Sequence, residues 1–128
     1  MNEKILFING NNFRDIEGFY SEIDSQFTKD VPWKAGHNLD AFNDLLMGGF
    51  GVYDYGESIR IVWKNAEKSQ GDLGYKETIK YYERILHQSK TNTIRRLFND
   101  AKEGKGKTLF EIIVEIIEAH ETIELEFN

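Results

Sequence analysis

The segment Ser58-Ile-Arg-Ile-Val-Trp63 is rich in β-branched and aromatic side chains, and it predicts a strand. Two further segments have strand character. Lys4–Ile8 is a short apolar run that ends at the turn signal Asn9-Gly10, and Thr122–Phe127 alternates apolar with acidic residues, as a half-exposed edge strand does. Because helical segments separate the three strands, their connections should be right-handed crossovers. The sequence therefore predicts an α/β fold, with a small three-stranded parallel sheet flanked by helices.

Apolar residues at helical spacing occupy the segments between the strands. A first helix is expected after the cap residue Asp15, and a short second helix after the cap residue Asn38. Residues 70–74 are expected to form a turn, two helices should follow before Gly104, and a last helix should occupy Thr108–His120. We expect one domain over residues 1–128, with an insertion of extra helices at about 70–107 that shares its core. The stripe expected to face this core from the second inserted helix is Ile94, Leu97, Phe98 and Ala101.

Composition limits the classes of function. The chain has 128 residues, 22 acidic against 16 basic side chains, and no cysteine. A net charge of −6 argues against direct binding of nucleic acid, which requires a basic patch, and it permits an acidic surface that attracts a basic protein. The lack of cysteine favours a reducing compartment, so we expect a cytoplasmic protein. The apolar runs are too short for a signal peptide or a membrane span.

Asp40 and Asp44 lie four residues apart on the short helix that follows Asn38. They share the face opposite its apolar side chains, where like charges repel and a cation from a partner would be a natural complement. A merely solvated acidic face explains the spacing equally well. A catalytic or metal-binding pair is a third interpretation, but no nucleophile or further ligand lies near in the sequence. We therefore expect no enzymatic activity.

Two other patterns are typical of chemical sites. Ala101–Thr108 fits a relaxed phosphate-loop pattern, but the residues before it predict a helix instead of the required strand, which favours a joint between two helices. His37, His87 and His120 are scattered and do not have metal-ligand spacing, so no metal and no cofactor are predicted. His37 precedes the acidic helix and can contact a partner or titrate there.

The segment Pro32–Leu46 resembles the signature of the barstar family of intracellular ribonuclease inhibitors. Its kernel is Gly36-His37-Asn38-Leu39-Asp40-Ala41-Phe42-Asn43-Asp44. Ile8-Asn9-Gly10, Trp63 and Leu109–Phe127 are similar to the family's opening strand, second strand, and last helix and strand. The resemblance covers about residues 1–69 and 108–128. The intervening segment is similar to the extra helices of longer barstar-like proteins.

The resemblance implies inhibition of a ribonuclease by mimicry of RNA phosphate, as by an immunity protein that neutralises a toxin. Asp44 would be the phosphate mimic and Asp40 its companion. Lys34 and Asn43 stand where the best-known member has aromatic residues, and Lys34 would be repelled by a basic pocket, so the resemblance does not identify the target. The expected partner-binding residues are Lys34, Gly36, His37, Asn38, Asp40, Asn43, Asp44 and Glu115.

The expected partner is a basic ribonuclease or ribonuclease-like toxin, and the unbound chain should be a monomer without contact to nucleic acid or membrane. Two alternatives stay open. One is a general protein-interaction module whose acidic face binds a basic protein that is not a nuclease. The other is a nucleotide-binding enzyme that uses Ala101–Thr108.

Overall fold

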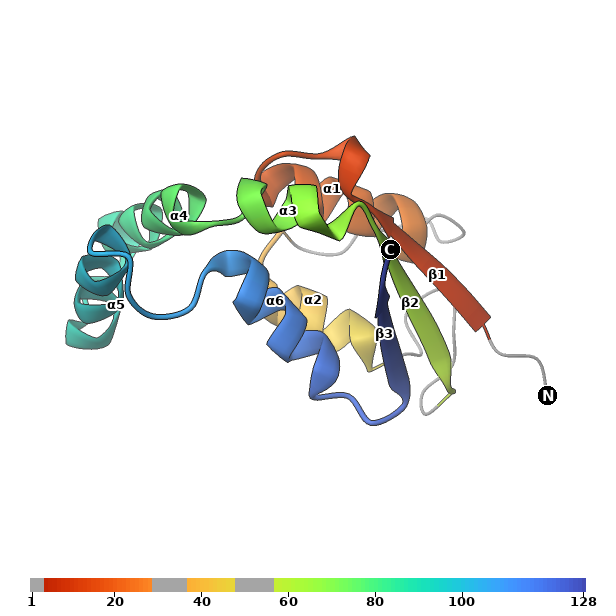
Figure 1. Cartoon of the computed structure of the whole chain (residues 1–128). Coiled ribbons are helices and arrows are strands. Elements are labelled where there is room, and N and C mark those ends of the chain that lie inside the picture. The colour runs from red at the N-terminus through yellow and green to blue at the C-terminus, as the bar shows by residue number, and fades with distance from the viewer. Residues whose placement is uncertain (1–3, 29–36, 48–56) are drawn as a thin grey trace.

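A computed structural model describes residues 4–28, 37–47 and 57–128 of the chain. Its sheet has the strand order β1 (Lys4–Asn9), β2 (Ile59–Lys64) and β3 (Ile123–Phe127), and both pairings are parallel (Figure 1). The register places Ile61 of β2 between Leu6 of β1 and Leu125 of β3. The predicted three-stranded parallel sheet is therefore confirmed, and β3 is an edge strand as expected.

One face of the sheet carries the hydrophobic core. Leu6, Ile61 and Trp63 are buried on that face, whereas Ile5 and Phe7 alternate with them and are exposed. Trp63 is at the centre of this core, since its ring stacks on Phe19 of the first helix at 5.7 Å between centroids. The helices that cover this face are α1 (Ile16–Phe27), α2 (Leu39–Leu46) and α6 (Leu109–Glu118).

Side-chain caps fix where these helices begin. The Asp15 carboxylate accepts a hydrogen bond from the Gly18 amide at 2.7 Å, and the Asn38 side chain accepts one from the Ala41 amide at 2.7 Å. Both caps predicted from the sequence are therefore confirmed. At α6, Thr108 and Glu111 form a capping box, in which each side chain bonds the backbone of the other residue.

The turn expected at residues 70–74 is wrong, because the helix α3 (Ala66–Asp72) occupies most of it. Its neighbours hold this short helix against the core. The Ser69 hydroxyl accepts a hydrogen bond from the Trp63 indole at 3.0 Å, and the Lys68 ammonium donates to the Phe13 carbonyl at 2.7 Å. These tertiary bonds stabilise a helix whose own sequence, with Gly71 inside it, favours a turn.

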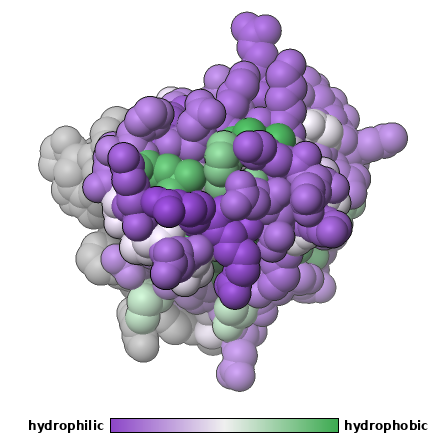
Figure 2. Space-filling model, turned by 90° about the vertical axis from the view of Figure 1, so that its left-hand side faces the viewer, coloured by the Kyte–Doolittle hydropathy of each residue, from purple (hydrophilic) through white to green (hydrophobic). Residues whose placement is uncertain are grey.

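The helices α4 (Tyr75–Gln88) and α5 (Asn92–Lys102) form a hairpin that extends away from the sheet (Figure 1). The expectation that the stripe of α5 faces the main core is wrong. Ala101 is buried, but Ile94, Leu97 and Phe98 are only half-buried and none of the four belongs to the core cluster. The stripe packs on α4 instead, because the hairpin leaves the core before α5 begins. Seen from the hairpin side, the surface is mainly hydrophilic and is interrupted by a narrow hydrophobic band (Figure 2).

The base of the hairpin is nevertheless joined firmly to the core. The Thr78 hydroxyl accepts a hydrogen bond from the Leu109 amide at 2.8 Å, and the Leu73 carbonyl accepts one from the Phe110 amide at 3.0 Å. Glu77, which is also nearly buried, accepts one from the Ile16 amide at 2.9 Å. The first turn of α4 is thus fixed to the starts of both α1 and α6. None of the helices in the described ranges has the length and apolar character needed to cross a membrane.

Candidate partner-binding surface

The outer face of α2 carries the two carboxylates singled out from the sequence. Phe42, Leu45 and Leu46 are buried against the core, and Asp40 and Asp44 are exposed. The two carboxylates thus share the outward face, as their spacing of four residues predicts. Within residues 4–28, 37–47 and 57–128, neither side chain has a hydrogen bond or an ion pair, so both are available to a partner.

A shallow groove between α2 and α6, here called the α2–α6 groove, brings Asp40 together with Glu115. Asn43 lines it on the α2 side, and Asp44 follows directly in the chain without lining it. The three carboxylates named from the sequence therefore belong to two neighbouring helices that are in contact. The lining residues are Leu39, Asp40, Asn43, Lys107, Ile112, Glu115, Ile116 and Ala119.

Glu115 differs from the two aspartates because it has a partner. Its carboxylate accepts from the ammonium of Lys107, in a pair whose side chains are 62% and 58% exposed. Such exposed pairs contribute only about 0–1 kcal/mol, and water or another cation can replace either partner. Glu115 thus contributes its negative charge to this surface, but part of that charge is balanced by Lys107.

His37 lies at the start of α2 and contacts α1. Its two ring nitrogens are each 3.1 Å from a carboxylate oxygen, Nδ1 from Glu17 and Nε2 from Asp24. The hydrogen bond to Asp24, followed by that to Glu17, raises the pKa of His37 above its usual 6.5. The imidazole therefore ties the segment that leads into α2 to α1, a role that the sequence did not reveal.

Of the other expected contact residues, the structure describes Asn38 and Asn43. Asn38 caps α2, and Asn43 Oδ1 is 2.7 Å from Nε2 of His120, just beyond the end of α6. Lys34 and Gly36 lie outside the described residues. In the described part of the chain, no group of three or more potential ligands is placed to hold a metal ion.

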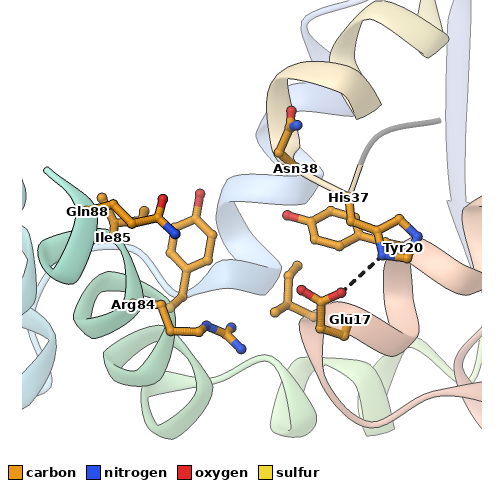
Figure 3. A pocket seen from close by; sticks show the side chains of 9 residues that line it. Glu17, Tyr20, His37, Asn38, Arg84, Ile85 and Gln88 are labelled. Atoms are coloured by element: carbon orange, nitrogen blue, oxygen red, sulfur yellow. Dashed lines mark hydrogen bonds and ion pairs between the residues drawn. The ribbon is translucent and has the colours of Figure 1, made fainter.

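A second groove, here called the α1–α4 groove, lies between α1, the start of α2 and α4 (Figure 3). Sequence reasoning selected His37 and Asn38 from its lining and missed the remainder. Glu17 and Tyr20 come from α1, and Arg84 comes from α4 on the opposite wall. No local pattern could have found them, because packing alone brings α1 and α4 together. The lining residues are Ile16, Glu17, Tyr20, His37, Asn38, Tyr81, Arg84, Ile85 and Gln88.

The phosphate-loop pattern has no phosphate-loop geometry. Helix α5 precedes it, and Gly104 and Gly106 adopt φ values of 72° and 80° in the turn that leads to α6. These left-handed conformations favour glycine, and Gly104 ends α5 as predicted. Lys107, which would hold the phosphates, pairs with Glu115 instead. The segment is the predicted joint between two helices.

The fold and this surface define a class: a small α/β protein that presents an acidic helix beside a parallel sheet. A family model described as Barstar (barnase inhibitor) matches residues 3–116, and the chain belongs to this family. The match runs through the inserted segment at about 70–107. A search of curated proteins found no match.

Proposed function

We propose that this chain inhibits a ribonuclease by placing the carboxylates of α2 in the basic active site of the enzyme. The family supports a role as a ribonuclease inhibitor. The observation that carries the proposal is that Asp40 and Asp44 are exposed on one face of α2 and are unpaired among the described residues.

The proposed mechanism is electrostatic. A ribonuclease binds RNA phosphates with lysine and arginine side chains, and two carboxylates on one helical turn offer these cations a similar arrangement of negative charge. The net charge of −6 would also accelerate the encounter with a basic enzyme, and salt would weaken that effect. We propose further that the protein acts in the cytoplasm as a monomer, without a cofactor and without catalysis of its own.

The test is inhibition of a panel of basic ribonucleases, with barnase among them, by the wild-type chain and by Asp44→Ala. For the inhibited enzyme, we expect Asp44→Ala to weaken binding by about 2–5 kcal/mol, because it leaves buried cations of the enzyme unpaired. Glu67→Ala is a matched control, since Glu67 is an exposed carboxylate on α3.

A loss below about 0.5 kcal/mol for Asp44→Ala, which is typical of an exposed ion pair, would contradict the mechanism. If no ribonuclease is inhibited and α2 instead binds a basic protein that is not a nuclease, the chain is a general interaction module. Binding of such a protein that depends on Asp40 and Asp44 would establish that alternative.

A further inference from the structure

The start of α1, the end of α3 and the first turns of α4 border a third groove, here called the basic groove. None of its lining residues belongs to α2 or α6, so the groove is separate from the proposed inhibitory surface. Its charged lining consists of three cations and three carboxylates, which are Arg14, Lys76, Lys80, Asp15, Asp72 and Glu77.

Each of the three carboxylates already has a partner within the chain. Asp15 bonds the first turn of α1 as its cap. Asp72 pairs with the Lys68 ammonium at 2.6 Å. Glu77 accepts from the amide at the start of α1 and lies 4.0 Å from the Arg84 guanidinium. The negative charge of the lining is therefore largely balanced by groups of the chain itself.

The three cations of the lining have no such partners. Arg14, Lys76 and Lys80 are exposed, and within the described ranges none of them takes part in an ion pair or a hydrogen bond. With Lys68 and Arg84, which pair with two of the carboxylates, five cations surround the groove against three carboxylates. This surplus of positive charge favours an anion as the ligand.

The helix α4 and the hairpin add to the positive potential. The N-cap residue of α4 is Gly74, which has no side chain to accept from the amides of the first turn, and a helix N-terminus carries a partial positive charge. Residues 75–107 have nine basic and four acidic side chains, a charge of +5, whereas the remainder has seven and 18, a charge of −11. The net charge of −6 therefore does not describe this surface, which lies at the base of the hairpin where α3 leads into α4 (Figure 1).

We infer that the basic groove binds a phosphate group, which the side chains of Arg14, Lys76 and Lys80 hold by charge-assisted hydrogen bonds. A phosphate monoester has a charge of about −1.5 to −2 and three strong acceptor oxygens, so it can engage three cations simultaneously. A carboxylate has a single charge and two oxygens, and it would leave one cation unpaired. Inorganic phosphate and the phosphates of RNA both supply this chemistry, and the test distinguishes these two sources.

The test is an NMR titration of the full chain with inorganic phosphate at constant ionic strength, so that general screening of charge stays the same. We expect saturable backbone amide shifts at Asp15, Lys76 and Lys80, with a Kd on the order of 10 millimolar, because the contacts are exposed to water. Lys76→Gln and Lys80→Gln should each weaken binding about three- to tenfold, since each removes one charge-assisted hydrogen bond.

Lys90→Gln is the matched control, because Lys90 is an exposed lysine just beyond the end of α4 that does not line the groove. It removes the same charge from the chain, and it should bind phosphate like the wild type. Spectra of the free variants show whether each retains its fold. The titration involves no nuclease, so loss of this site and loss of the proposed function are separate results.

A short single-stranded RNA, of about six nucleotides, is the second probe. If RNA is the source of the phosphate, this strand should bind at least about tenfold more tightly than inorganic phosphate, because it also reaches other cations of the hairpin, and Lys76→Gln should weaken it. Equal or weaker binding of the strand would assign the groove to free phosphate.

Three results would overturn the inference. The first is an absence of saturable shifts at the groove. The second is equal affinity of Lys76→Gln and Lys90→Gln for phosphate, which would mean that the hairpin attracts anions diffusely and has no site. The third is binding of acetate as tight as that of phosphate, which would mean that the groove receives carboxylates, such as those of an acidic protein.

Discussion

The helices on the sheet and the helices of the hairpin have similar amphipathic patterns. Their apolar side chains are nevertheless buried to different degrees. Ile113 of α6 is fully buried in the aromatic core around Trp63, whereas Ile94 of α5 is half-buried and has α4 as its neighbour. An apolar stripe determines which side of a helix avoids water, but the depth of burial depends on the number of layers that cover it. The comparison shows that a core-like sequence pattern does not by itself place a helix in the core.

The largest expected effect comes from two isoleucine substitutions that test this comparison directly. Ile113→Ala should lower the free energy of unfolding by about 3–4 kcal/mol, because it leaves a cavity in a closed core. Ile94→Ala should lower it by only about 1 kcal/mol, because part of that side chain already contacts water. Denaturant unfolding of both variants gives the two values.

Equal losses for the two variants would contradict the division into core and hairpin. The same curves also test the predicted single domain over residues 1–128. One cooperative transition for the wild type supports it, and a separate early transition that only Ile94→Ala shifts would show that the hairpin unfolds independently.

Glu77 tests the joint between the two regions. Glu77→Ala should destabilise the protein by about 2 kcal/mol, because the Ile16 amide at the start of α1 loses its acceptor. The control is Glu83→Ala, which removes an exposed carboxylate from the same helix. Thermal and denaturant unfolding should separate the two variants, and a similar small effect for both would show that the joint contributes little.

His37 connects α2 to α1. Its contribution to the free energy of unfolding should be smaller and should depend on pH. The pKa of His37 is raised in the folded protein, so its stabilisation should be complete below about pH 6.5 and should disappear as the pH rises through the folded value. The side chain is 42% exposed, which limits the effect to less than about 1 kcal/mol.

An NMR titration of the His37 ring should give a pKa above 6.5 in the wild type and a lower value in Asp24→Asn. A wild-type value at or below 6.5 would show that the two carboxylates do not hold the ring in solution.

The smallest effect is expected for Lys107→Ala, which removes the exposed partner of Glu115. Stability should change by less than about 0.5 kcal/mol. Addition of ATP with Mg²⁺ should leave the Tm of both the wild type and this variant unchanged, because Lys107 lies in a joint between helices. If ATP raised the Tm of the wild type and Lys107→Ala abolished that increase, the result would support the nucleotide-binding interpretation.

Much of the candidate site follows from local sequence. The cap at Asn38 and the shared outer face of Asp40 and Asp44 depend on residues three or four positions apart, which helix geometry alone relates. The pairing of Glu115 with Lys107 was not predicted, since a turn between helices brings Lys107 to α6. The groove at Tyr20 was also not predicted, because its walls come from α1 and α4.

The sequence by itself determined the three parallel strands, most of the helices that connect them and the caps of α1 and α2. Hydrophobic periodicity and capping act within a few residues, so they can be recognised without the fold. Only the tertiary structure decided that α3 is a helix, that the hairpin stands away from the core, and that Glu77 caps α1 from 61 residues away. Those outcomes depend on which surfaces meet when the chain packs, and no local pattern encodes the meeting of residues so far apart.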